Sequence, residues 1–176
     1  RPSMGKTSLA INNFCLSASI QEDLAVGVFS LEMSKMQLTE MMLCSLARVN
    51  SHRLRRGLGK PEDWQRMGDA LGRLPSANVF IDDTPGLPIM QLRSKARRLK
   101  SQEDIDMLVV DYLQLIGGEQ SSSYDSRHQE ISGIARALKD MARELNVPIV
   151  ALSQLSRQVE RRVEKRPILS DLAESG

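Results

Sequence analysis

The sequence predicts an α/β fold in which helices pack on both faces of a mostly parallel β-sheet. Two observations lead to this prediction. Continuous apolar runs of strand length alternate with longer amphipathic stretches of helical period, a pattern typical of parallel sheets buried on both faces. The chain also has no internal repeat and no linker-like stretch, so residues 1–176 are expected to form a single domain.

The first half of the chain accounts for three helices and two strands. Ser34 is a good N-cap for the second helix, and Pro61 suits the first position of the third, where no N–H bond is lost. The strands are short apolar runs bounded by polar residues. Helices are expected at residues 7–19, 34–47 and 61–74, and strands at residues 24–30 and 78–81.

The second half adds two strands and two helices. Gly117, Gly118 and the serines at 121–123 predict a loop before the longest amphipathic helix, which ends ahead of Pro148. Strands are expected at residues 107–110 and 149–152, and a helix at residues 88–100. One face of the longest helix contains Ile131, Ile134, Ala135, Leu138, Ala142 and Leu145.

The composition is that of an ordinary soluble domain, with 41% hydrophobic and 26% charged residues and a formal net charge of +2. That charge argues neither for nor against nucleic acid, so any such contact would come from local clusters. Cys15 and Cys44 lie in apolar helical patterns, which predicts buried, reduced thiols. Together with the lack of a signal peptide or membrane-length apolar run, they favour a cytoplasmic protein with no membrane partner.

The chain opens on most of a phosphate-binding loop. Gly5, Lys6 and Thr7 complete the pattern G-x-x-x-x-G-K-[ST], whose leading glycine would precede Arg1. We therefore expect a piece of a longer protein that lacks the first strand of its domain. In such loops backbone N–H groups and the lysine bind phosphates, while the threonine hydroxyl binds Mg²⁺. The expected cofactors are ATP and Mg²⁺, and the expected nucleotide contacts are Ser3, Met4, Gly5, Lys6, Thr7 and Ser8.

A strand tip supplies the second expected magnesium ligand. Asp111 directly follows the apolar run at residues 107–110, and ligands of open parallel sheets bind at the carboxyl ends of the strands. Asp82 and Asp83 also follow apolar residues, but Asp-Thr-Pro-Gly is a turn signature and the run before it is shorter. The predicted metal ligands are therefore Thr7 and Asp111.

Two further polar residues follow predicted strands. Glu32 suits the task of orienting and deprotonating a water that attacks a γ-phosphate, although a glutamate in the first turn of a helix is also favoured by the helix dipole. Gln154 can hydrogen-bond the γ-phosphate and report its loss, or it can be merely a solvated strand end. The predicted catalytic residues are Lys6, Glu32 and Gln154.

Basic residues fall into two groups. Those on the helix at residues 88–100, Lys95 among them, are expected to form a solvated outer face. Arg127 and Arg157 lie on segments leaving strand tips, where loops can reach a polyanion. Their basic neighbours are His128, Arg161, Arg162, Lys165 and Arg166. Because only 3% of residues are aromatic, binding of single-stranded DNA would rest on backbone contacts and be insensitive to sequence.

Four short segments are more specific together than alone. They read RPSMGKT at residues 1–7, FSLEM at 29–33, VDYLQL at 110–115 and ALSQLSR at 151–157. KRP at 165–167 and SDL at 170–172 extend the set. In order and spacing the set resembles the family of DnaB-type bacterial replicative DNA helicases over essentially the whole chain. RecA-type recombinases share the fold but not this combination of segments.

The resemblance implies a RecA-like P-loop NTPase core that hydrolyses ATP and unwinds duplex DNA from 5′ to 3′ at the replication fork, as a homo-hexameric ring around single-stranded DNA. It implies that Lys6 and Thr7 contact ATP and Mg²⁺, and that Asp111 is the Walker B residue. Glu32 would be the catalytic carboxylate and Gln154 the phosphate sensor. Further implied partners, through the full-length protein, are primase and a helicase loader.

The last segment departs from the family pattern. The family usually has S-D-[LI]-R-E-S-G, whereas residues 170–176 read SDLAESG, with Ala173 in place of the arginine. This loop faces the DNA channel in the family, so one cationic contact is missing. Backbone N–H groups can still serve phosphates there, and Glu174 and Gly176 join Arg127 and Arg157 as expected DNA contacts. Further family motifs would follow Gly176, so the C-terminal part of the core is also expected to be missing.

Two other functions are compatible with the sequence. A recombinase-type ATPase would share the fold and assemble as a filament. The second alternative is a non-catalytic assembly module, because a chain without the first strand and a trans-acting arginine should hydrolyse ATP negligibly. A glycine before Arg1 and an acidic continuation after Gly176 would favour the motor.

Overall fold

The computed structural model describes residues 5–117, residues 124–155 (side chains from residue 130), and residues 159, 162, 164, 166–168 and 171. Its helices are α1 (Lys6–Ser8), α2 (Leu16–Gln21), α3 (Lys35–Ala47), α4 (Ser51–Arg55), α5 (Pro61–Arg73), α6 (Ile89–Glu103) and α7 (Tyr124–Leu145). The strands are β1 (Val26–Ser30), β2 (Val79–Asp82), β3 (Met107–Asp111) and β4 (Ile149–Ala151), and the shorter helical segments are η1 (Leu9–Cys15), η2 (Leu74–Ser76) and η3 (Leu113–Leu115). No helix in these ranges is long and apolar enough to cross a membrane.

Four parallel strands form one sheet in the order β2-β1-β3-β4. Val26 of β1 pairs with Val79 of β2 and with Met107 of β3, while Ser30 pairs with Asp111 at the other end. Since all four strands run in the same direction, their carboxyl ends meet at one edge of the sheet. The predicted parallel α/β fold is confirmed, and the sheet brings the predicted strand tips close to one another.

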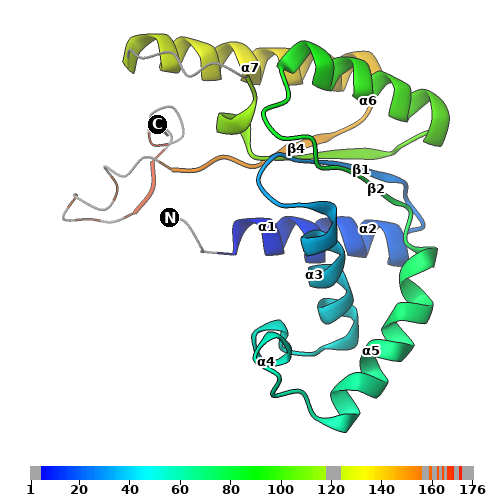
Figure 1. The fold of residues 1–176 in the computed structure, drawn as a ribbon. Helices are drawn as coiled ribbons and strands as arrows, with labels where there is room; N and C mark the ends of the chain where they lie inside the picture. The colour runs from blue at the N-terminus through cyan, green and yellow to red at the C-terminus, as the bar shows by residue number, and fades with distance from the viewer. Residues whose placement is uncertain are drawn as a thin grey trace.

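Helices cover both faces of the sheet (Figure 1). Successive strand residues point to opposite faces. Val28 and Val109 pack in a cluster with α3 and the helix after Gly5, whereas Phe29 and Val110 pack in a cluster with α6 and α7. α3 and α5 continue away from the sheet and share a smaller apolar cluster. The sheet thus divides the core into two halves and presents its carboxyl edge between them.

The first helix extends from Lys6 to Gln21 through α1, η1 and α2, beyond the predicted range of residues 7–19. Its middle segment η1 is π-helical, with Ala10, Ile11 and Cys15 buried. The spacing of apolar residues in the sequence did not reveal this, because both helix types bury one face over so short a stretch. Both cysteines of the chain are buried, as predicted.

The other elements lie close to their predicted ranges. Ser34 caps α3 with its side chain, and Pro61 begins α5. β1 begins at Val26 and not at residue 24, because the Leu24 N–H turns back to the Ala18 carbonyl (3.0 Å). The short helix α4 was not predicted. α7 begins at residue 124, well before the apolar face on which its prediction rested.

Candidate functional site

The backbone enters its first helix through Gly5, whose φ is +81°. This left-handed conformation is readily adopted only by glycine, and a Cβ placed there would meet no atom within 4 Å. Lys6, Thr7 and Ser8 form the first turn, and no side chain among the described residues caps it. Uncapped N–H groups and the helix dipole make such a helix start a site for anions.

Three of the predicted residues meet beside this turn. The Thr7 hydroxyl donates a hydrogen bond to Oδ2 of Asp111 (2.5 Å), and Lys6 Nζ lies 3.6 Å from Oδ1. Asp111 is only 1% exposed, and Oδ1 accepts no hydrogen bond from any described residue. Lys6 Nζ also lies 3.9 Å from the centroid of the Tyr112 ring. The site therefore has a buried carboxylate with one oxygen unsatisfied, next to a lysine and a threonine.

Glu32 lies at the same edge of the sheet. Ser30 is level with Asp111 in the sheet, and the Leu31 N–H donates to the Asp111 carbonyl (2.7 Å), which continues the pairing one residue beyond β1. Glu32 follows at once and its side chain is exposed. Its carboxylate therefore faces solvent at the carboxyl edge of the sheet, where Asp111 also lies.

Gln154 reaches this edge from β4. The pairing of β3 with β4 continues past the strands, since Leu152 N–H donates to the Val110 carbonyl (2.9 Å) and Leu113 N–H donates to the Leu152 carbonyl (3.0 Å). Gln154 is half-buried, and the side chain of Gln114 binds its backbone. Sequence reasoning missed Gln114, although a polar residue so close behind a buried strand tip was a usable signal.

Asp82, the competing strand-tip acid, is engaged elsewhere. It accepts hydrogen bonds from Lys95 Nζ (2.6 Å) on one oxygen, and from the N–H and hydroxyl of Thr84 (3.0 and 2.6 Å) on the other. Burial raises the pKa of Asp82, but these bonds outweigh it and hold the pKa below its ordinary value. Asp83 accepts a bond from the N–H of Lys35 at the start of α3 (2.8 Å).

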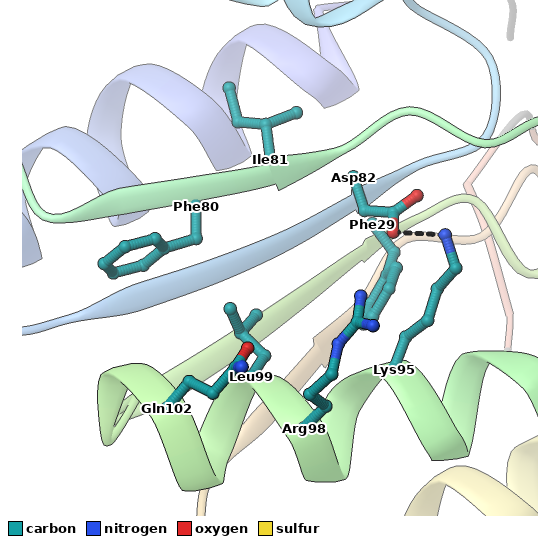
Figure 2. A pocket seen from close by; sticks show the side chains of 8 residues that line it. All are labelled: Phe29, Phe80, Ile81, Asp82, Lys95, Arg98, Leu99 and Gln102. Atoms are coloured by element: carbon teal, nitrogen blue, oxygen red, sulfur yellow. Dashed lines mark hydrogen bonds and ion pairs between the residues drawn. The ribbon is translucent and has the colours of Figure 1, made fainter.

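Figure 2 shows the surroundings of Asp82, with Lys95 reaching toward it from α6. A cleft of about 150 Å³ between β2 and α6 is lined by Phe29, Phe80, Ile81, Asp82, Lys95, Arg98, Leu99 and Gln102. α6 covers the face of the sheet opposite the Lys6 helix (Figure 1), so the cleft between β2 and α6 lies on that face. Asp82 and Asp111, the two strand-tip acids, thus contact different parts of the molecule.

The prediction of a solvated basic face on α6 was partly wrong. Lys95 is bound to Asp82, and Arg93 and Arg97 both bind Glu144 on α7. The sequence could not indicate this, because the partners come from other elements of the fold. Arg98 remains exposed with no ion-pair partner among the described residues.

The predicted DNA contacts are described only in part. Arg127 lies within α7, for which only the backbone is described at this position. Arg162, one of the basic residues that follow Arg157 in the sequence, makes two hydrogen bonds to the fully buried Asp171 (2.5 and 3.0 Å). Asp171 also accepts a bond from the Ile168 N–H (2.7 Å). Ser3, Met4, Arg157, Glu174 and Gly176 lie outside the described residues.

In this site a left-handed glycine precedes an uncapped helix start, and a lysine and a threonine from that helix face an aspartate at the tip of a parallel strand. This arrangement is typical of the α/β proteins that bind nucleoside triphosphates through a phosphate-binding loop. The sequence model of the DnaB-like helicase C terminal domain matches residues 1–176. The chain therefore belongs to the DnaB-like helicase C-terminal domain family, as the resemblance predicted.

Similar proteins of known identity agree with this assignment. The chain is 48% identical over 176 residues to the replicative DNA helicase DnaB of Geobacillus stearothermophilus and to the replicative DNA helicase DnaC of Bacillus subtilis (strain 168). All of the chain is covered in both cases, but it spans only 38% of the length of each relative. It is thus homologous to part of an ATP-hydrolysing replicative helicase, and membership of this ATPase family implies nucleotide binding.

Solved structures show the same fold. One, described as a DnaB-like replicative helicase and its interactions with primase, superposes with a TM-score of 0.84 at 39% identity, covering all of this chain and 42% of that one. A second, described as an ATPase domain, superposes with a TM-score of 0.83 at 39% identity, covering all of this chain and 62% of that one. The parallel sheet flanked by helices is the common feature of this chain and these structures.

Proposed function

We propose that residues 1–176 are a partial RecA-like motor domain which, within a full-length replicative helicase, hydrolyses ATP to unwind duplex DNA from 5′ to 3′. The observation that carries this proposal is the meeting of Lys6, Thr7 and Asp111 at the carboxyl edge of the sheet. Family membership of the whole chain supports it. The protein would act at the replication fork in the bacterial cytoplasm.

ATP would bind with its phosphates against the start of the first helix. Gly5 lets the backbone approach the phosphates closely, and the N–H groups of Lys6, Thr7 and Ser8 begin the helix there. Lys6 is about one-third exposed and can turn from Asp111 toward a phosphate. Ser3 and Met4 complete the proposed loop.

The residues present fit Mg²⁺. The hydroxyl of Thr7 and the carboxylate of Asp111 are the hard oxygen ligands that this ion prefers, and Oδ1 of Asp111 is buried without a hydrogen bond from any described residue. The described residues contain no group of three or more His, Cys, Asp or Glu that could hold a metal ion, and phosphate oxygens and water would supply the other ligands. The bound ion would neutralise negative charge on the β- and γ-phosphates.

Hydrolysis would use the two polar residues beyond β1 and β4. Glu32 would orient the attacking water and accept its proton, for which an exposed carboxylate beside the site is suited. Gln154 would hydrogen-bond the γ-phosphate and pass on its loss to the segment that follows it. Arg127, Arg157 and the backbone of Glu174 and Gly176 would contact single-stranded DNA inside a homo-hexamer. Primase and a loader would bind through other parts of the full-length protein.

The test uses the full-length protein with Lys6→Ala and Glu32→Ala. Steady-state ATP hydrolysis should fall at least about 100-fold in both variants, whereas equilibrium binding of a labelled ATP analogue should be lost only in Lys6→Ala. Glu103→Ala, an exposed glutamate at the far end of α6, is the matched control and should keep wild-type turnover. Unchanged hydrolysis in Glu32→Ala would refute its role, and filaments in place of rings under the microscope would favour a recombinase.

A further inference from the structure

The side chain of Gln114 binds both the backbone N–H and the backbone carbonyl of one residue after β4, Gln154. Its Nε2 donates to the Ser153 hydroxyl (2.9 Å) and to the Gln154 carbonyl (3.3 Å), while its Oε1 accepts from the Gln154 N–H (3.3 Å). A primary amide is the side chain that can both donate to a carbonyl and accept from an N–H in this way. Gln114 therefore acts on Gln154 as a neighbouring strand would.

This contact extends a short strand. β4 has three residues, and its last, Ala151, is exposed. Beyond it the backbone bonds of Leu152 to Val110 and Leu113 continue the pairing with β3. Among the described residues, the amide of Gln114 continues this series by one more residue, to the N–H and carbonyl of Gln154.

Gln114 is itself firmly placed, and on the segment that touches the phosphate-binding lysine. It belongs to η3, and Leu113 in η3 and Ile116 directly after it are 9% and 1% exposed and pack in the core with α6 and α7. Two residues earlier, the Tyr112 ring lies 3.9 Å from Lys6 Nζ. Residues 111–114 thus contact the predicted nucleotide site at one end and Gln154 at the other.

We infer that Gln114 is a positioning residue that sets the place of Gln154 relative to Lys6 and Asp111. The inference rests on the proposed function, in which Gln154 binds the γ-phosphate. Without the amide of Gln114, the backbone at Gln154 loses two hydrogen bonds and can drift from the γ-phosphate. Nucleotide affinity, which rests on the helix start, should hardly change, whereas turnover should fall because misplacement of a reacting group by about 1 Å can cost up to 100-fold.

The experiment compares Gln114→Ala and Gln114→Glu in the full-length protein. Gln114→Ala should lower kcat roughly 10- to 100-fold while KM for ATP changes less than about twofold. Gln114→Glu keeps an acceptor for the Gln154 N–H but loses the donor to its carbonyl, so its kcat should lie between wild type and Gln114→Ala. Gln91→Ala, an exposed glutamine of α6, is the matched control and should keep wild-type kcat.

Amide hydrogen exchange gives a readout that does not depend on turnover. In Gln114→Ala, protection of the Gln154 N–H should fall while that of Val109 in the centre of β3 persists, which also shows that the variant is folded. Wild-type kcat in Gln114→Ala, or equal loss of protection at both amides, would overturn the inference and leave the proposed function standing. A wild-type protein without ATP hydrolysis would overturn the proposed function and this inference with it.

Discussion

Asp82 at the end of β2 and Asp111 at the end of β3 each contact one lysine and one threonine. The partners of Asp82 lie 2 and 13 residues away, and both of its oxygens accept hydrogen bonds. Asp111 meets a threonine 104 residues away and is buried with one oxygen that accepts no bond from a described residue. A satisfied carboxylate stabilises the fold, whereas a buried, partly unsatisfied one is suited to bind a ligand.

The largest expected effect separates these two acids directly. Asp111→Asn should lower ATP hydrolysis by at least about 100-fold, because it removes the charge proposed to hold Mg²⁺. Asp82→Asn should leave hydrolysis within about twofold and lower the free energy of unfolding by about 1 kcal/mol, since its ion pair is partly exposed. Steady-state kinetics and urea denaturation measure the two effects. A comparable loss of turnover in both variants would mean that the contrast between the acids has no functional meaning.

A smaller effect, on the free energy of unfolding, is expected from a change in the packing between β1 and α6, the helix that contains Lys95. A Cβ on Gly27 of β1 would lie 2.8 Å from Leu99 of α6 and 2.9 Å from Leu108. Gly27→Ala should therefore destabilise the fold by about 1–3 kcal/mol as α6 is pushed from the sheet. Thermal melting checks this against Gly68→Ala on α5, where a Cβ meets nothing within 4 Å and helix propensity should raise stability by up to about 1 kcal/mol. Equal melting temperatures for the two variants would contradict the crowding.

The smallest expected effect is a loss of stability at acid pH, on the face of the sheet that α6 and α7 cover. Hydrogen bonds from Arg97 and Arg93 hold the pKa of Glu144 down to about 2, from an ordinary value of 4.5. Because the pKa is lower in the folded state, the bonds stabilise the fold fully above about pH 4.5 and lose this effect as the pH falls toward 2. Glu144→Gln should thus melt slightly below wild type at pH 7, and the difference should vanish near pH 2.

Glu103→Gln, at an exposed position, is the control for that titration and should follow wild type at every pH. Melting curves between pH 7 and pH 2 provide the measurement. A difference between Glu144→Gln and wild type that persists unchanged to pH 2 would show that the carboxylate charge is not what links α6 to α7.

Much of the fold followed from neighbouring residues. Within the described part of the chain, the apolar runs predicted all four strands, and Ser34 and Pro61 marked the starts of their helices, because caps and strand burial depend on a few adjacent side chains. The turn signature after Asp83 favoured Asp111 as the ligand for the same local reason. The π-helical turn in the first helix escaped prediction, since its hydrogen bonds leave little trace in apolar spacing.

For this chain, local sequence was enough to predict the fold class, a helix that starts after Gly5 and the polar residues at the strand tips, because each of them depends on consecutive side chains. The choice of partners needed the folded chain. Three contacts depend on residues that lie apart in the sequence. They are the ion pair of Lys95 with Asp82, the hydrogen bonds of Arg162 to Asp171, and the hydrogen bonds of Gln114 to Gln154. Hydrogen bonds and ion pairs of this kind form across the sheet and between loops, where spacing along the sequence does not reveal which groups will meet.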